Sequence, residues 1–245
     1  GNSDTVGSSS SIEGTYGTLT LDTDGSYSYV ATTSSANALG ASETGTDTFT
    51  FLVSDGTTTT SSTIQFTVNG VNDAPVSSAS SVTTNEDTTY TFTADDFSFT
   101  DEEGDTLSSV TVSALSGSDG TFLLNGAAIT GSTTVSKADI DAGLLTFVPD
   151  ANENGSDYNT FTFTVNDGND DSGSSTMTVN VTPVNDAPTT VPDTDSVTEG
   201  GTVQDTDGQG VVLSNDSDED GDSLSVSGTI THTASDGSSV SGGNS

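Results

Sequence analysis

The sequence predicts an all-β protein built from tandem two-layer β-sandwich domains, and three observations lead to this prediction. Apolar and polar residues alternate over short segments that are bounded by Gly, Asn, Asp or Ser, which is typical of half-buried strands. Several of these segments recur at a nearly constant distance along the 245 residues. Only 29% of the residues are hydrophobic, so each domain is expected to be small and to have a thin core.

The first strands are expected to form hairpins. Residues 16–21 and 26–30 alternate around an Asp-Gly turn, and residues 121–129 repeat the pattern around Asn125-Gly126. The later strands carry their apolar residues on one face, in two matching sets: Phe49, Phe51, Val53, Ile64, Phe66 and Val68, and then Phe161, Phe163, Val165, Met177, Val179 and Val181. The one expected helical turn covers residues 136–142, where Ser136 can cap it.

An internal repeat sets the expected domain boundaries. TFTFLVSDG at residues 48–56 recurs as TFTFTVNDG, 112 residues later, and VNDAP ending at Pro75 recurs 113 residues later. This period is the length of one immunoglobulin-sized sandwich. We therefore expect the back part of one repeat in residues 1–72, a complete repeat in 73–184, and the front part of a third in 185–245.

The front of the repeat is marked by two further matches. DEEGDTL at residues 101–107 recurs as DEDGDSL at 218–224, and SVTTNEDT at 81–88 parallels SVTEGGT at 196–202. The chain also begins and ends with Gly-Asn-Ser. Two interpretations of this match stay open: chance in a Gly/Ser-rich region, or one period of an array in which neighbouring periods complete the split domain. The first residues lack the features of a signal peptide, so we expect an internal or processed segment.

The charge excludes several classes of partner. The sequence has one basic residue, Lys137, and 37 acidic residues, so the formal net charge is -36. Binding to nucleic acid or to an anionic membrane surface needs Lys and Arg, so neither partner is expected. No apolar run approaches the ~20 residues that span a bilayer, so no direct membrane insertion is expected. An acidic chain of this kind repels itself unless cations intervene.

The type of acidic residue distinguishes calcium loops from disorder or a merely solvated surface. Asp outnumbers Glu by more than three to one, and much of it sits beside Gly, Asn or another Asp. Short carboxylates on tight turns are typical of calcium loops. Cysteine is absent from the sequence, so extra stabilisation has to come from metal or from packing.

Two acidic loops are the strongest candidate metal sites. Asp101, Glu103 and Asp105 alternate along a loop that Gly104 bends, so their side chains can converge. Carboxylates ~5 Å apart at an effective dielectric of 20 repel by roughly 3 kcal/mol, so convergence needs a cation, whereas splayed side chains do not. The second loop repeats the arrangement with Asp216, Asp218, Asp220 and Asp222.

An enzymatic function is not expected. His232 is the only histidine, and it lies in an alternating Ser/Thr strand where a bystander role is the simpler interpretation. Paired acids can hydrolyse glycosides, but here they lie in repeated loops, and the chain has no Trp to stack on a sugar.

The run from Phe161 through FTVNDG to VNDAP resembles the last two strands and linker of cadherin repeats. It is also similar to the bacterial cadherin-like tandem repeats of giant secreted adhesins, and residues 13–75 resemble the VCBS-type repeats of the same proteins. The resemblance implies an immunoglobulin-like sandwich, calcium at the domain junctions and a role as an extender. It implies one calcium site formed by Asn72, Asp73, Asp101, Glu103 and Asp167, and another formed by Asn185, Asp186, Glu86, Asp218 and Asp220.

The expected function is a calcium-rigidified stalk segment of an extracellular, cell-surface adhesin or fibre, whose partners are neighbouring repeats or adjacent copies. Two other functions stay open, a self-assembling filament whose half-domains complete each other and a glycan- or protein-binding module. Some acidic residues also have two interpretations, as turn residues or as calcium ligands: Asp22, Asp24, Asp55 and Asp167, and, as a possible junction set, Glu153, Asn154, Asp157, Glu43 and Asp47.

Overall fold

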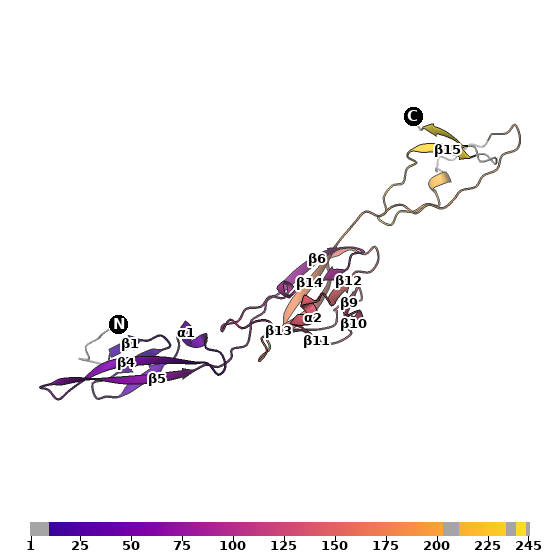
Figure 1. The fold of residues 1–245 in the computed structure, drawn as a ribbon. Helices are drawn as coiled ribbons and strands as arrows, with labels where there is room; N and C mark the ends of the chain where they lie inside the picture. The colour runs from indigo at the N-terminus through magenta and orange to yellow at the C-terminus, as the bar shows by residue number, and fades with distance from the viewer. Residues whose placement is uncertain (1–9, 203–210, 234–238, 244–245) are drawn as a thin grey trace. The chain divides into compact units, whose positions relative to one another are not determined.

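The structure is a computed structural model that describes residues 10–202, 211–233 and 239–243. Almost all of its regular structure is β, which confirms the predicted fold class (Figure 1). The chain divides into two compact units, residues 1–182 and 183–245. Among the described residues, no helix is long and apolar enough to cross a membrane.

Residues 10–70 form two small antiparallel sheets. The elements are β1 (Ser10–Glu13), β2 (Thr18–Leu21), β3 (Tyr27–Val30), α1 (Ser34–Asn37), β4 (Thr44–Ser54) and β5 (Thr59–Asn69). One sheet has the order β1-β2-β3, and β4 pairs with β5 in the other. Leu21 lies opposite Tyr27, so the hairpin predicted around the Asp-Gly turn is confirmed.

The core of residues 10–70 is thin. Tyr29 stacks on Phe66 with ring centroids 4.2 Å apart, and it meets Phe49 edge-on. Leu19 and Phe49 are the only buried hydrophobic residues in the described part of this segment. The two sheets are therefore joined mainly by a small aromatic cluster.

Residues 72–182 form a two-sheet sandwich with a much larger core. Its elements are β6 (Ser80–Asn85), β7 (Tyr90–Thr91), η1 (Ala94–Asp96), β8 (Ser109–Val112), β9 (Thr121–Leu124), β10 (Ala127–Ala128), β11 (Thr133–Ser136), α2 (Lys137–Asp141), β12 (Leu145–Val148), β13 (Gly155–Asn166) and β14 (Ser175–Thr182). The sheets have the orders β11-β8-β13-β14-β6 and β10-β9-β12-β7. Only the β6–β14 pairing is parallel.

The apolar faces predicted for this sandwich are confirmed. Phe161, Phe163 and Val165 on β13 are at most 2% exposed, as are the predicted residues of β14. The predicted hairpin is the β9–β10 pair, in which Asn125 and Gly126 both have positive φ, as a two-residue turn requires. The predicted helical turn is α2, and the Ser136 hydroxyl accepts the backbone N–H of Asp139 as its cap.

The parallel β6–β14 pairing places the two connections of the sandwich at opposite ends. Ser80 at the start of β6 lies opposite Met177, near the beginning of β14, and Asn85 lies opposite Thr182, its last residue. The chain therefore enters beside the beginning of β14 and leaves from its end. β14 runs from Ser175 to Thr182, so its two ends lie about 23 Å apart at ~3.3 Å per residue step.

Residues 183–245 contain little regular structure in their described part. The elements are η2 (Val211–Leu213), β15 (Thr229–Thr233) and β16 (Ser239–Gly243), and β15 pairs with β16. His232 lies in β15 opposite Val240. None of the hydrophobic side chains described in this unit is buried, so its described part has no core of its own.

Candidate metal centre

The first candidate site is built around the acidic loop that begins at Asp101. Gly104 has a φ of 82°, a left-handed conformation that bends the loop. One carboxylate oxygen of Asp101, Oδ1, accepts the backbone N–H groups of Glu103 at 3.0 Å and of Asp105 at 2.9 Å. The loop is thus folded around the Asp101 side chain.

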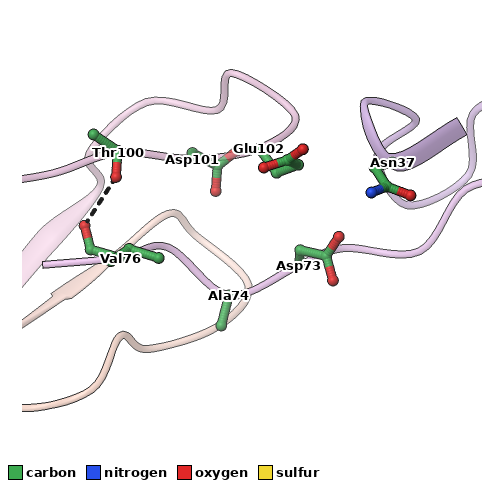
Figure 2. Close-up of a pocket in the computed structure, with 7 residues that line it drawn as sticks. All are labelled: Asn37, Asp73, Ala74, Val76, Thr100, Asp101 and Glu102. Carbon is green, nitrogen blue, oxygen red and sulfur yellow. Dashed lines mark hydrogen bonds between the residues drawn. The ribbon is translucent and has the colours of Figure 1, made fainter. Parts of the chain in front are cut away.

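The linker at Asp73 is tied to this loop. The backbone N–H of Asp73 donates to Glu103 Oε1 at 3.0 Å. Three residues further on, Val76 exchanges backbone hydrogen bonds of 2.7 and 3.0 Å with Thr100, and Figure 2 shows this pair hydrogen-bonded beside Asp101. Asp73, Ala74, Asp101 and Glu102 contribute to the lining of an open hollow next to them.

Asn72 joins the linker to the loop between β13 and β14. Its side-chain N–H group donates to Asp167 Oδ2 at 3.1 Å and to Asp170 Oδ2 at 2.9 Å, and its Oδ1 accepts from the Asn169 side chain at 2.9 Å. Sequence reasoning named Asn72 and Asp167 but missed Asn169 and Asp170. The signal for both was present, because they follow Asp167-Gly168 in the same Asn/Asp-rich turn.

Hydrogen bonding lowers the pKa of Asp167. Burial alone would raise the pKa of this carboxyl, but hydrogen bonds from the backbone of Asp170 and Asn169 and from the Asn72 side chain outweigh it. The carboxyl is therefore ionised throughout the neutral range.

Two carboxylate oxygens at this site are buried and have no hydrogen-bond partner, Asp101 Oδ2 and Glu103 Oε2. The other oxygen of each group is engaged, so these two belong to carboxylates that the backbone already holds in place. A buried unpaired oxygen on a charged group is costly. Carboxylate oxygens are preferred ligands of calcium, so these two unpaired oxygens suit this ion.

The acidic side chains do not by themselves form a closed cage. In the residues that the structure describes, no group of three or more His, Cys, Asp or Glu side chains is arranged to hold a metal ion. A complete coordination sphere at this site would need amide or backbone carbonyl oxygens, or water, in addition to the two free carboxylate oxygens.

The second linker repeats the geometry of the first. The N–H of Asp186 donates to Asp220 Oδ2 at 2.6 Å, and Asp218 Oδ1 accepts from the backbone of Asp220 and of Asp222. Each of these bonds has its counterpart at the first linker. The Val76–Thr100 pairing likewise has its counterpart in Thr189 and Ser217, with backbone bonds of 2.7 and 3.0 Å.

Three side chains predicted for the second site have other partners. Asp216 Oδ1 accepts the backbone N–H of Val191 at 2.8 Å, further along the linker. Asn185 donates to the carbonyl of Asp186, as Asn72 does to the carbonyl of Asp73. Glu86 lies in the other unit, where it is 3% exposed and its Oε2 accepts from the Asn154 side chain at 2.9 Å.

Most of the acidic residues that could be either turn residues or calcium ligands accept hydrogen bonds within local turns. Asp24 accepts from the backbone and hydroxyl of Ser26, and Asp55 accepts from the backbone of Thr57 and Thr58, so both act as turn residues. Other acidic residues bind nearby groups: Asp22 the Ser26 hydroxyl, Glu43 the N–H of Gly40, and Glu153 the Tyr158 hydroxyl. Asp157 uses its backbone N–H to donate to Asn180.

Asp47 has a structural function. It is 5% exposed, and its carboxylate accepts the backbone N–H groups of Thr15, Tyr16 and Gly17 and the hydroxyl of Tyr29. Burial alone would raise the pKa of this carboxyl, but these hydrogen bonds outweigh it and lower the pKa. All four partners are donors, so the charge of Asp47 joins the turn before β2 to strands β3 and β4.

The two-sheet topology defines residues 72–182 as a β-sandwich module, and the acidic loop that begins at Asp101 is tied to the linker that precedes the sandwich. Comparison with known families agrees: residues 72–182, just under half of the chain, match the family described as the bacterial Ig domain. Residues 72–182 are thus similar to bacterial Ig domains, which are non-catalytic structural modules typical of surface and adhesion proteins. No curated protein matches the chain. The immunoglobulin-like part of the resemblance is thus confirmed, whereas the cadherin-like and VCBS-type parts stay predictions.

Proposed function

We propose that this chain is a spacer segment of a long extracellular, cell-surface adhesin or fibre of bacteria, and that calcium at its linkers stiffens it. The proposal draws on the family of residues 72–182, whose members are typical of surface proteins. It depends above all on one observation, the buried unpaired oxygens of Asp101 and Glu103 beside a linker that is tied to the same loop.

The ligands in this proposal come from two repeated sets. At the first linker they are Asp101 and Glu103, with Asn72, Asp73, Asp105 and Asp167 as further oxygen donors. At the second they are Asn185, Asp186, Asp218, Asp220 and Asp222. A cation at either linker offsets the repulsion of a chain with a net charge of -36 and holds linker and loop together.

The expected affinity is that of an extracellular calcium module, with a dissociation constant of ~10⁻⁴–10⁻³ M. At a tenfold excess of calcium, each independent site adds about 1.4 kcal/mol to the free energy of unfolding. For a domain of roughly 110 residues this corresponds to an increase in Tm of about 6 °C.

The experiment is a calcium titration of the full chain, followed by calorimetry, thermal unfolding and solution scattering. Calcium should raise the Tm and increase the maximum dimension of the particle, and excess chelator should reverse both effects. Glu103→Gln should weaken binding at the first linker, whereas Glu102→Gln should not, because Glu102 is an exposed neighbour with the same charge. Identical binding by the two variants, or a Tm that does not respond to calcium, would contradict the proposal.

A further inference from the structure

The first and last strands of residues 72–182 are neighbours that run in the same direction. β6 is the first strand of this segment and β14 is the last. They pair in parallel over six residues each, from Ser80 opposite Met177 to Asn85 opposite Thr182 (Figure 1). The preceding linker therefore joins the pair at one end, and the following linker leaves it at the other end.

This arrangement determines how tension on the two linkers acts on the pair. Pulling the linkers apart displaces β6 along its axis in one direction and β14 in the opposite direction, so all hydrogen bonds between the two strands are strained together. In an antiparallel pair of terminal strands, both linkers attach at the same end, and tension breaks the bonds one after another. Forced unfolding is governed by the rate of unfolding, so a load that has to break many bonds in one step is resisted for longer.

Side chains reinforce the pair toward the end of β14. The Thr182 hydroxyl lies 3.2 Å from the carbonyl oxygen of Thr84 and 2.6 Å from Asn85 Oδ1, and it donates to one of these acceptors at a time. The Asn180 side chain donates to the carbonyl of Val82 at 3.3 Å. β14 is thus tied to β6 by side chains as well as by the backbone.

A cluster of serine hydroxyls fastens the chain just before β6. Ser77 Oγ lies 3.1 Å from Ser172 Oγ and 2.8 Å from Ser175 Oγ, and it also contacts the carbonyl oxygen of Gly173 at 3.0 Å. Ser172 is 7% exposed, and its Oγ accepts the backbone N–H of Val165. The incoming chain is therefore bonded to the start of β14 and to the turn before it. All of these groups are uncharged, so the contacts do not need a cation.

We propose that the β6–β14 pair and the contacts of Ser77 form a mechanical clamp, which keeps residues 72–182 folded when the chain is pulled from its two linkers. The inference rests on the spacer function proposed above, because only a chain that carries tension uses a clamp. It adds a second device to that function. Calcium stiffens the linkers, whereas neutral hydrogen bonds within the sandwich resist the load, and the length of the spacer is preserved under tension.

Single-molecule force spectroscopy of the full chain tests the clamp. The chain has no cysteine, so two introduced thiols define the points at which the force acts. Ala79→Cys with Pro183→Cys attaches the handles just before β6 and just after β14, and the force then shears the pair. In the control, Thr89→Cys replaces Ala79→Cys, so the force enters beyond β6 and bypasses the clamp. All three positions are exposed.

The force needed to unfold residues 72–182 should be about twofold higher or more in the shearing geometry than in the control. The length of chain released identifies the event as unfolding of this domain. Equal forces in the two geometries would overturn the proposal. Detachment of β6 in a separate step at low force, before the rest of the domain unfolds, would overturn it as well.

Two valine variants, compared in the shearing geometry, test the side-chain contacts. Thr182→Val removes the hydroxyl that bonds β6, and it should raise the unfolding rate under force about three- to tenfold. Thr111→Val removes a hydroxyl that lies 2.8 Å from that of Thr134 in the same sheet but outside the clamp. It should leave the rate under force unchanged. Equal effects of the two variants would contradict the assignment of Thr182 to the clamp.

Calcium separates this inference from the proposed function. The difference in force between the two geometries should persist in excess chelator, because the clamp contains no metal ligand. A chain that shows this difference but does not respond to calcium would contradict only the proposed function. A chain that calcium stiffens, and that unfolds at equal force in both geometries, would contradict only the clamp.

Discussion

Replacing Asp47 by Asn removes one negative charge from a buried position where every partner is a donor. The isosteric amide has a single acceptor oxygen, and its best orientation keeps this oxygen at the Oδ2 position, where Tyr16, Gly17 and Tyr29 donate. The amide N–H₂ group then faces the backbone N–H of Thr15, which loses its acceptor at 2.8 Å. We expect Asp47→Asn to destabilise residues 10–70 strongly.

The magnitude follows from the four hydrogen bonds. A bond to a charged acceptor contributes about 1.5–3 kcal/mol and a neutral one about 0.5–1.5, so three retained bonds lose about 1 kcal/mol each. The lost bond to Thr15 adds about 1.5 kcal/mol, and partial access of water to this turn reduces the total to about 4 kcal/mol. Asp24→Asn, the same charge change at a fully exposed turn, should change the stability much less.

Amide hydrogen exchange is the appropriate assay because it resolves the domains of one molecule. Protection of β4 and β5 should decrease in Asp47→Asn, and protection of β13 and β14 should not change. A change in the exchange free energy of β4 below about 1 kcal/mol, or one equal to that of Asp24→Asn, would refute the assignment of Asp47 as the centre of this segment.

The pH dependence of the same variant has a definite sign. The pKa of Asp47 is lower in the folded chain than its ordinary value of 3.8, so its stabilising contribution is fully present above that pH. The contribution is lost as the pH falls through the folded pKa. The difference in stability between wild type and Asp47→Asn should therefore be constant at neutral pH and should shrink below pH 3.8.

Two further predictions concern the cores and the tyrosines. Val165→Ala, at a fully buried position, should destabilise residues 72–182 by about 2–3 kcal/mol. Val53→Ala, at the equivalent exposed position, should lower the free energy of unfolding by less than about 0.5 kcal/mol. Urea unfolding of dilute protein measures both changes. Burial and a carboxylate neighbour raise the pKa of Tyr29, Tyr90 and Tyr158 to about 12. Absorbance titration should show these groups ionising well above 10, and the stability that they contribute should be lost between pH 10 and 12.

Alternating hydrophobicity made the main strands predictable. Phe161, Phe163 and Val165 occupy every second position, and only one face of a strand can bury such a set, so their common orientation needed no tertiary information. Pairing order was not predictable in the same way. The parallel addition of β6 to β14 joins residues almost 100 positions apart, and no local pattern specifies which edge a returning strand occupies.

The candidate sites were predictable where the sequence repeats itself. Asp73 and Asp186 are both tied to an acidic loop by a backbone N–H, and the repeated Asn-Asp-Ala-Pro and Asp-x-x-Gly-Asp motifs had marked both partners. The free oxygens of Asp101 and Glu103 were not predictable, because they depend on which oxygen of each group the backbone already occupies. The function of Asp47 was also hidden, since its donors lie some 30 residues earlier in a turn without charged residues.

The repeat position of Asp47 is occupied in the complete domain by Asn159, and both side chains are buried. Each bonds the Gly-x-x-Gly turn that precedes the next strand, residues 14–17 in one case and 117–120 in the other. The backbone groups that the turn presents determine whether a carboxylate or an amide suits this position. Asp47 meets three N–H groups there, whereas Asn159 accepts the N–H of Gly117 and donates to the carbonyl of Asp119 at 2.6 Å.

The reciprocal change, Asn159→Asp, should therefore also destabilise its domain, by about 3 kcal/mol, because the introduced carboxylate loses the donor and faces the carbonyl of Asp119. Protonation restores a donor, so the pKa of the introduced carboxyl should lie above 3.8 and the loss should diminish as the pH falls through it. Urea unfolding at pH 7 and pH 4 measures both effects. A loss that does not depend on pH would show that packing, and not the direction of the hydrogen bond to Asp119, determines the residue at this position.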